Sequence, residues 1–151
     1  MDWFERITGF KEENYEATRA RLAVDGDWLR SDAHDRRYSI GRLELPSLAE
    51  LRQRSASLPA AKARTTLRAV VGDAGGLHRD PAHAGALFQV ASQFNLLEMT
   101  GPSVYPEDGV TRYAHDRTQG PACAIAAGAA TIYGNYFAPV REQRGQTLHR
   151  Q

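Results

Sequence analysis

Short hydrophobic runs along the chain predict three strands. Residues Tyr38–Leu45 alternate apolar and polar side chains, as in a strand with one face toward a core, and Pro46 ends this segment. Residues Thr66–Val71 predict a second strand, which Gly72 closes. Residues Ala86–Ala91 are almost continuously apolar, which is typical of a strand covered on both faces.

Three other segments have the composition or the end signals of helices. Residues Glu12–Leu22 are polar and rich in helix-forming side chains. Ser47 and Glu50 have the spacing of a capping box, which predicts a helix over residues 48–58. Residues Gly120–Ala130 are rich in small side chains and begin with a Gly-Pro pair, so we expect a third helix there.

The order of these elements predicts an α/β fold with a mixed, largely parallel sheet flanked by helices. Residues Asp25–Asp27 are expected to form a turn, Ser31–Arg37 a solvated loop, and Thr131–Phe137 an extended segment. Residues 1–60 are interpreted as an N-terminal helical and strand extension that packs on a core. Residues 61–151 are interpreted as the first part of that α/β core, which lacks further strands.

Composition and charge narrow the functional classes. The chain has 151 residues, a hydrophobic fraction of 42% and a net charge of +1, as expected for one soluble domain. This small net charge argues against direct nucleic-acid binding by the chain as a whole, although it is compatible with a local basic patch. No apolar run is long enough to span a bilayer, so no membrane association is expected. The start of the chain lacks the pattern of a secretory signal, and Cys123 is the only cysteine, so a reducing, cytoplasmic setting is expected.

Polar side chains follow the predicted buried strands, at the strand ends where α/β folds bind ligands. Asp73 follows the strand at 66–71, and its carboxylate suits an exocyclic amine such as that of adenine. Ser92, Gln93 and Asn95 follow the next strand, and an amide such as that of Asn95 suits ribose hydroxyls. The alternative for each of these residues is ordinary turn chemistry.

A long loop before the last predicted helix is rich in acids. Glu98, Glu107, Asp108 and Asp116 lie within it, together with Gly109. Long ordered loops often carry function, and a carboxylate pair supplies a general acid and a general base. The alternative is a solvated surface loop in which the acids have no chemical role.

The start of the last predicted helix suits an anion. Thr118 or Gly120 caps it, Gln119 lies between them, and Pro121 fits the first helical position. Backbone N–H groups without helical partners then face a ligand. The alternative is a helix start without a ligand, and Cys123 is expected to be a small core residue of this helix. No metal is expected, since the His, Asp and Cys spacings match no metal-binding pattern. The residues weighed for a metal are His78, Asp80, His83, His115 and Asp116.

Two stretches resemble the macrodomain family. Residues 70–73, Val-Val-Gly-Asp, followed by residues 86–95 resemble the opening of a macrodomain, with a Gly-Asp turn and an apolar strand that ends in an Ala-x-x-Asn signature. Residues 118–127, TQGPACAIAA, resemble the segment of poly(ADP-ribose) glycohydrolase-type macrodomains in which a Gln-led acidic motif begins a helix. The resemblance spans about residues 66–137.

The resemblance implies binding of ADP-ribose or a related diphosphate nucleotide, or of an ADP-ribosylated macromolecule. By analogy with the family, Asp73 would bind adenine, Asn95 the distal ribose, and Gly109 the diphosphate. The glycohydrolase type continues its Gln with two catalytic glutamates, whereas Gln119 is followed by Gly120 and Pro121. Hydrolysis would therefore depend on Glu107, Asp108 or Asp116.

Two alternatives to a hydrolase remain at this stage. The first is a binding module without turnover, and the second is an interaction domain in which aromatic residues contact a partner. The aromatic residues considered for that role are Trp3, Phe4, Phe10 and Trp28. No cofactor is expected in any of these cases. A macrodomain continues with further strands, so either residues 1–60 supply the missing layers or the sequence is a fragment.

Overall fold

The computed structural model describes residues 1–42, 44, 46–59, 65–89, 105–116 and 119–138. Two compact units are distinguished. The first comprises Met1–Gly41 and Gly72–Gln151, and the second comprises Arg42–Val71. The predicted boundary at residue 60 stays a prediction.

The first unit begins with two short helices that local side chains cap. Helix α1 (Trp3–Thr8) starts at Asp2, whose Oδ1 accepts the Glu5 N–H at 2.7 Å. It ends at Gly9, where a φ of 80° lies in the left-handed region that glycine adopts without strain. Helix α2 (Tyr15–Ala20) starts at Asn14, whose side chain accepts the Ala17 N–H at 2.9 Å. It lies within the predicted helical segment at 12–22.

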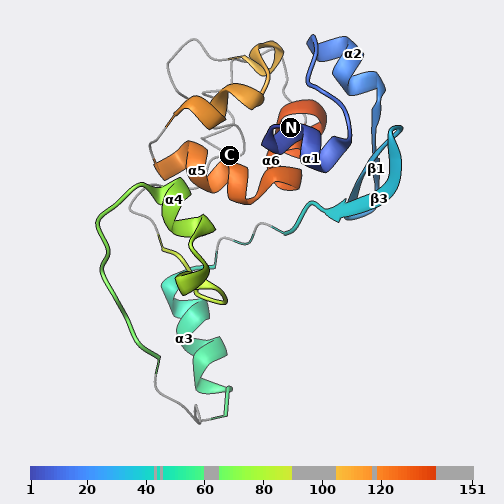
Figure 1. Ribbon diagram of the computed structural model, residues 1–151. Coiled ribbons are helices and arrows are strands. Elements are labelled where there is room, and N and C mark those ends of the chain that lie inside the picture. The colour runs from blue at the N-terminus through green and yellow to red at the C-terminus, as the bar shows by residue number, and fades with distance from the viewer. Residues whose placement is uncertain (43, 45, 60–64, 90–104, 117–118, 139–151) are drawn as a thin grey trace. The chain divides into compact units, whose positions relative to one another are not determined.

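A three-stranded antiparallel sheet follows in the order β1-β2-β3 (Figure 1). Strands β1 (Leu22–Asp25) and β2 (Trp28–Ser31) form a hairpin in which Asp25 lies opposite Trp28. Strand β3 (His34–Ser39) pairs with β2, and Leu29 lies opposite Tyr38. The predicted turn at Asp25–Asp27 is confirmed, since Gly26 has a φ of 56° between the two paired strands.

The later part of the first unit is helical. Helix α4 (Ala74–Arg79) and the 3₁₀ turn η1 (Pro81–His83) come first. The 3₁₀ segments η2 (Pro106–Asp108) and η3 (Thr111–His115) precede helices α5 (Gln119–Ala126) and α6 (Gly128–Phe137). Helix α5 packs against α4, η3 and α6, and α6 in turn packs against α1 and β3.

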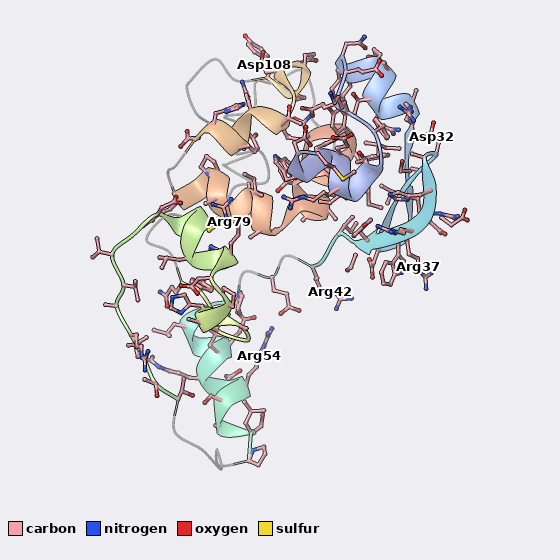
Figure 2. The ribbon with its side chains drawn as sticks, viewed as in Figure 1. Asp32, Arg37, Arg42, Arg54, Arg79 and Asp108 are labelled. Carbon is pink, nitrogen blue, oxygen red and sulfur yellow. The ribbon has the colours of Figure 1, made fainter. Side chains whose placement is uncertain are left out.

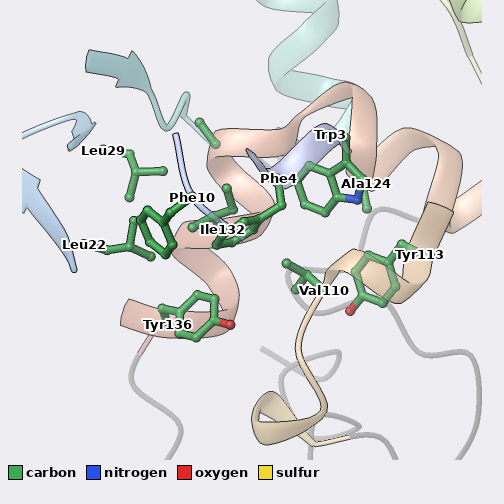
Figure 3. Close-up of a cluster of buried hydrophobic side chains, with 11 residues drawn as sticks. Trp3, Phe4, Phe10, Leu22, Leu29, Val110, Tyr113, Ala124, Ile132 and Tyr136 are labelled. Carbon is green, nitrogen blue, oxygen red and sulfur yellow. The ribbon is translucent and has the colours of Figure 1, made fainter. Parts of the chain in front are cut away.

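The hydrophobic core joins the N-terminal segment, residues 3–29, to residues 110–136 (Figure 3). Phe4 of α1 and Ile132 of α6 are fully buried. Tyr113 of η3 and Val110, the residue before η3, are also fully buried. Leu22 and Leu29 extend the core into the sheet. The core therefore depends on contacts between segments that are more than one hundred residues apart.

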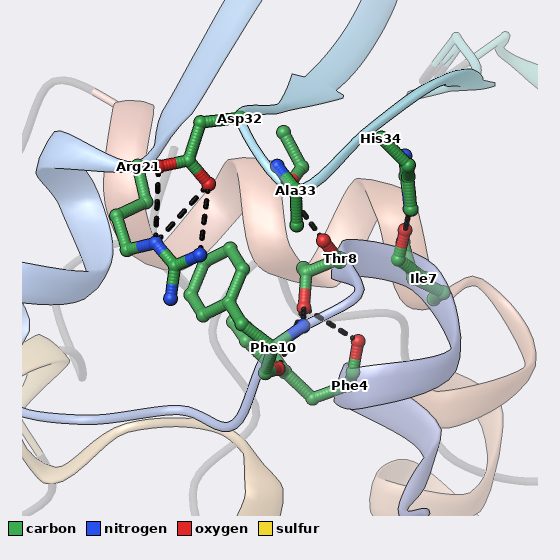
Figure 4. Close-up of polar contacts among 9 residues, drawn as sticks. Phe4, Ile7, Thr8, Phe10, Arg21, Asp32, Ala33 and His34 are labelled. Atoms are coloured by element: carbon green, nitrogen blue, oxygen red, sulfur yellow. Dashed lines mark hydrogen bonds and ion pairs between the residues drawn. The ribbon is translucent and has the colours of Figure 1, made fainter.

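Polar contacts attach α1 to the sheet (Figure 4). The buried Thr8 hydroxyl donates to the carbonyl oxygens of Phe4 and Phe10 at 3.0 and 2.9 Å. His34 Nε2 donates to the Ile7 carbonyl at 2.9 Å, and the Arg21 guanidinium pairs with Asp32 at 3.0 Å. The His34 bond attaches the end of α1 to the beginning of β3, and the Arg21 pair joins the residue before β1 to the turn between β2 and β3.

The second unit carries helix α3 (Leu48–Ala56), which confirms the helix predicted after Ser47. Both halves of the capping box are present. The Ser47 hydroxyl oxygen accepts the Glu50 N–H at 3.2 Å, and the Glu50 carboxylate accepts the Ser47 N–H at 2.6 Å. Within the described part of this unit no α3 residue is buried, and Leu48 is 62% exposed.

The predicted largely parallel mixed sheet is wrong, because the sheet of the described residues has three antiparallel strands. Residues 66–71 and 86–89 have no regular secondary structure, and residues 90 and 91 lie outside the described part. Val71 and Leu87 are fully exposed. A short apolar run becomes a buried strand only when neighbouring strands pair with it, and these runs have none in the described structure.

Two further local predictions are wrong for a related reason. Residues 31–37, predicted as a loop, form the end of β2, a turn and most of β3. Residues 131–137, predicted as extended, are helical in α6. Tyr136 of α6 belongs to the core and Phe137 packs against it, so tertiary contacts override the local preference of aromatic side chains for strands.

Truncation of Ile132 tests whether the core shared by α1 and α6 stabilises the fold. Ile132 is fully buried, so Ile132→Ala is expected to lower the free energy of unfolding by about 2–5 kcal/mol. Leu48→Ala is the control, since its exposed side chain predicts a change within about 0.5 kcal/mol. Urea unfolding followed by circular dichroism measures both, and equal losses would contradict this description of the core.

Candidate functional site

The side chain of Glu12 is the centre of the polar contacts between the two ends of the first unit. Its carboxylate accepts the backbone N–H groups of Val110 and Thr111, both at 2.8 Å to the nearer oxygen. It also accepts the Thr111 hydroxyl at 2.6 Å and the Tyr136 hydroxyl at 2.7 Å. One carboxylate therefore holds four donors from two distant segments.

Gly109 leaves the space that this carboxylate occupies. A Cβ at residue 109 would lie 2.6 Å from Glu12 Oε2, closer than real Cβ contacts allow. The φ of Gly109 is 72°, which side chains other than glycine rarely adopt. A larger residue there would both strain the backbone and displace Glu12.

Tyr136 completes this arrangement from α6. Its ring is 2% exposed and stacks on Tyr15 with the ring centroids 5.2 Å apart. Burial is the largest cause that raises the pKa of Tyr136 far above its usual range, and the hydrogen bond to Glu12 acts in the same direction. The phenol therefore stays protonated and donates to Glu12 throughout the physiological range.

Arg112, the second residue of η3, has two guanidinium nitrogens that lack hydrogen-bond partners among the described residues. Its Nη1 lies 3.5 Å from Asp108 Oδ2, and the Asp108 carboxylate also accepts the Tyr105 N–H at 2.8 Å. Arg112 Nε and Nη2 are buried and have no hydrogen-bond partner among the described residues. These two atoms form one edge of the guanidinium, and such an edge has the geometry to donate two parallel N–H bonds to an oxyanion.

Asn135 has an acceptor that no group in the described part of the chain satisfies. Its Nδ2 donates to the Pro106 carbonyl at 3.0 Å and so attaches α6 to η2. The side chain is 1% exposed, and its Oδ1 has no partner among the described residues. Both the Arg112 and Asn135 side chains thus contact η2 with one polar atom, and each has further polar atoms that no described residue pairs with.

The structure gives two of the predicted ligand-binding residues local roles. Asp73 is the N-cap of α4, and its Oδ2 accepts the Gly76 N–H at 2.9 Å, as in the turn-chemistry alternative. Gly109 precedes N–H groups that do bind an anion, but that anion is the Glu12 carboxylate of the same chain.

The other predicted ligand-binding residues are described only in part. Gln119 and Gly120 begin α5, the helix that contacts both α4 and η3. The elements that follow Asp73 and Gly109 therefore meet at α5, although their polar side chains are not shown to converge. Ser92, Gln93, Asn95 and Thr118 lie outside the described residues.

The three predicted catalytic acids occupy different settings. Glu107 is exposed in η2, whereas Asp108 is held by Tyr105 and Arg112. Asp116 follows η3, and its backbone N–H donates to the Tyr113 carbonyl at 3.2 Å. Among the described residues no group of three His, Cys, Asp or Glu side chains is arranged to hold a metal ion.

Sequence reasoning missed Glu12, Arg112, Asn135 and Tyr136. Glu12 belongs to a polar stretch with several acids, and nothing local separates it from Glu13. Tyr136 and Asn135 fall in the segment predicted to be extended. Arg112 lies in the acidic loop, between Asp108 and Asp116. Its position as a basic residue between two acids is the one sequence signal that could have identified it.

Comparisons of the chain with protein-family models, curated proteins and solved structures found no match. The resemblance to macrodomains therefore stays a prediction from the sequence. No helix in the described part of the chain has the length and apolar character needed to cross a membrane.

Replacement of Glu12 tests the contacts at residues 110, 111 and 136. Glu12→Gln removes the charge and leaves one acceptor oxygen for four donors, so the free energy of unfolding is expected to fall by about 2–3 kcal/mol. Glu13→Gln, a change of the exposed neighbour, is expected to cost less than about 0.5 kcal/mol. Urea unfolding of both variants measures the difference, and a Glu12 variant as stable as the Glu13 variant would contradict the assignment.

Proposed function

We propose that this chain binds a diphosphate nucleotide, with ADP-ribose as the candidate ligand, and that Arg112 binds its phosphate oxygens. The observation that carries the proposal is the buried edge of Arg112, where Nε and Nη2 have no partner among the described residues. The choice of ADP-ribose comes from the sequence resemblance at residues 70–73, 86–95 and 118–127.

A buried N–H group without a hydrogen-bond partner destabilises the folded state, which supports the presence of a ligand at Arg112. Each buried N–H without a partner costs about 1–3 kcal/mol, so most such groups in proteins are paired. Arginine is always charged, and the parallel N–H bonds of Nε and Nη2 match two oxygens of one phosphate group. An oxyanion is thus the partner that best satisfies this edge of the side chain.

Neighbouring groups hold Arg112 in place. Asp108 pairs with Nη1 at the other end of the guanidinium, and the Tyr105 N–H in turn fixes the Asp108 carboxylate. This pair is partly exposed, so it contributes little to stability and serves mainly to orient the arginine. Asn135 Oδ1, which has no partner among the described residues, is an acceptor that suits a ribose hydroxyl or the adenine amine of the same ligand.

Binding without turnover is the form of the proposal that the residues favour. The Asp108 carboxylate is occupied by a backbone N–H and by Arg112, which disfavours a role in proton transfer. The two glutamates of the glycohydrolase motif are replaced by Gly120 and Pro121. Hydrolysis through Glu107 or Asp116 is the alternative, and it predicts release of ADP-ribose from a modified protein that Glu107→Gln or Asp116→Asn abolishes.

Calorimetric titration with ADP-ribose tests the role of Arg112. The wild-type chain is expected to bind, and Arg112→Gln is expected to weaken binding at least about 10-fold because a bidentate charged contact is lost. Arg112→Lys keeps the charge but not the parallel donors, so it is expected to bind nearly as weakly.

Arg79→Gln is the matched control, since it removes one positive charge from the exposed end of α4. It is expected to bind ADP-ribose like the wild type. Circular dichroism confirms that each variant is folded. Absence of binding by the folded wild type would refute the proposal, and equal affinities of the wild type and Arg112→Gln would remove Arg112 from the site.

A further inference from the structure

The charge of the chain is unevenly distributed between its two compact units. Residues 42–71 contain six basic and two acidic residues, a net charge of +4, whereas the rest of the chain has thirteen basic and sixteen acidic residues. No acid occurs between residues 51 and 72. Residues 42–71 therefore form a strongly basic unit, although the net charge of the whole chain is only +1.

We propose that the exposed arginines of this unit, Arg42, Arg52, Arg54 and Arg68, bind the phosphate backbone of a nucleic acid. The basic residues between positions 51 and 72 are Arg52, Arg54, Lys62, Arg64 and Arg68. A series of cations without intervening acids is the electrostatic pattern that attracts a polyphosphate chain. The proposal concerns a different unit from that of Arg112 and does not depend on ADP-ribose binding.

The described residues of this unit present their charges to solvent. Arg42, Arg52, Arg54 and Arg68 are all exposed, and Figure 2 labels the first and third of them. Arg54 Nη1 pairs with Glu44 at 3.0 Å, and both side chains are more than half exposed. A pair this exposed is weak and can exchange its carboxylate for a phosphate.

The distribution of the cations favours a nucleic acid over an acidic protein as the partner. The charges continue from α3 into residues 65–71, which have no regular structure and are exposed. A phosphate backbone offers charges along its whole length and so suits both parts. A protein groove would instead bind the face of α3 that carries Leu48 and Leu51, and the two partners therefore predict different sensitive residues.

Fluorescence anisotropy of the full chain with a 5′-labelled 20-nucleotide oligouridine tests the proposal. Four phosphate contacts, one for each exposed arginine described in this unit, predict a roughly 50-fold loss of affinity between 50 and 200 mM salt, since each contact on a single strand contributes about 0.7 to the logarithmic salt slope. Arg52→Gln/Arg68→Gln is expected to weaken binding about 10-fold at 50 mM salt and to reduce the slope by about 1.4.

Three controls separate the alternatives. Arg36→Gln/Arg79→Gln removes the same charge from exposed positions of the other unit and is expected to bind more tightly than Arg52→Gln/Arg68→Gln. Leu48→Ser/Leu51→Ser and Arg112→Gln are expected to bind like the wild type. The proposal is overturned if the wild type does not bind the oligouridine at 50 mM salt. It is also overturned if both arginine pairs weaken binding equally, or if the leucine variant alone loses binding.

Discussion

The Glu12 carboxylate is the contact on which the arrangement of the first unit depends. It joins the segment before α2 to η3 and to α6, and its partners at residues 110 and 136 lie 98 and 124 positions away in the sequence. Without this carboxylate, the backbone N–H groups of the fully buried Val110 and of Thr111 would lose their acceptor. Because buried donors without partners are costly, the polar contact and the hydrophobic core stabilise the same arrangement.

The features that the sequence predicted correctly are those whose cause is local. The capping box at Ser47 and Glu50 and the turn at Gly26 each depend on a few neighbouring residues. The largely parallel sheet was wrong because a strand requires partners that no short apolar run specifies. Likewise, nothing near Glu12 in the sequence indicates Val110 or Tyr136, since that contact is made only after the chain has folded.

The candidate site shows the same limit. Asp73 and Gly109 were predicted as ligand-binding residues because residues of these types bind nucleotides. In the structure Asp73 caps helix α4, and Gly109 leaves room for the Glu12 carboxylate. Arg112 could not be distinguished from other arginines until its surroundings were known. Its buried donors without a partner among the described residues, and its pair with Asp108, are properties of the folded chain. The basic unit, by contrast, is visible in the sequence once its boundaries at residues 42 and 71 are known.

A double-mutant cycle between Glu12 and Tyr136 tests the central claim most directly, because it isolates the contact between the two ends of the unit. The free energies of unfolding of Glu12→Gln, Tyr136→Phe and the double variant are compared with that of the wild type. The expected interaction energy is about 1–3 kcal/mol, with the double variant less destabilised than the sum of the single variants. Additive effects within about 0.3 kcal/mol would show that the two side chains do not stabilise each other and would contradict this account.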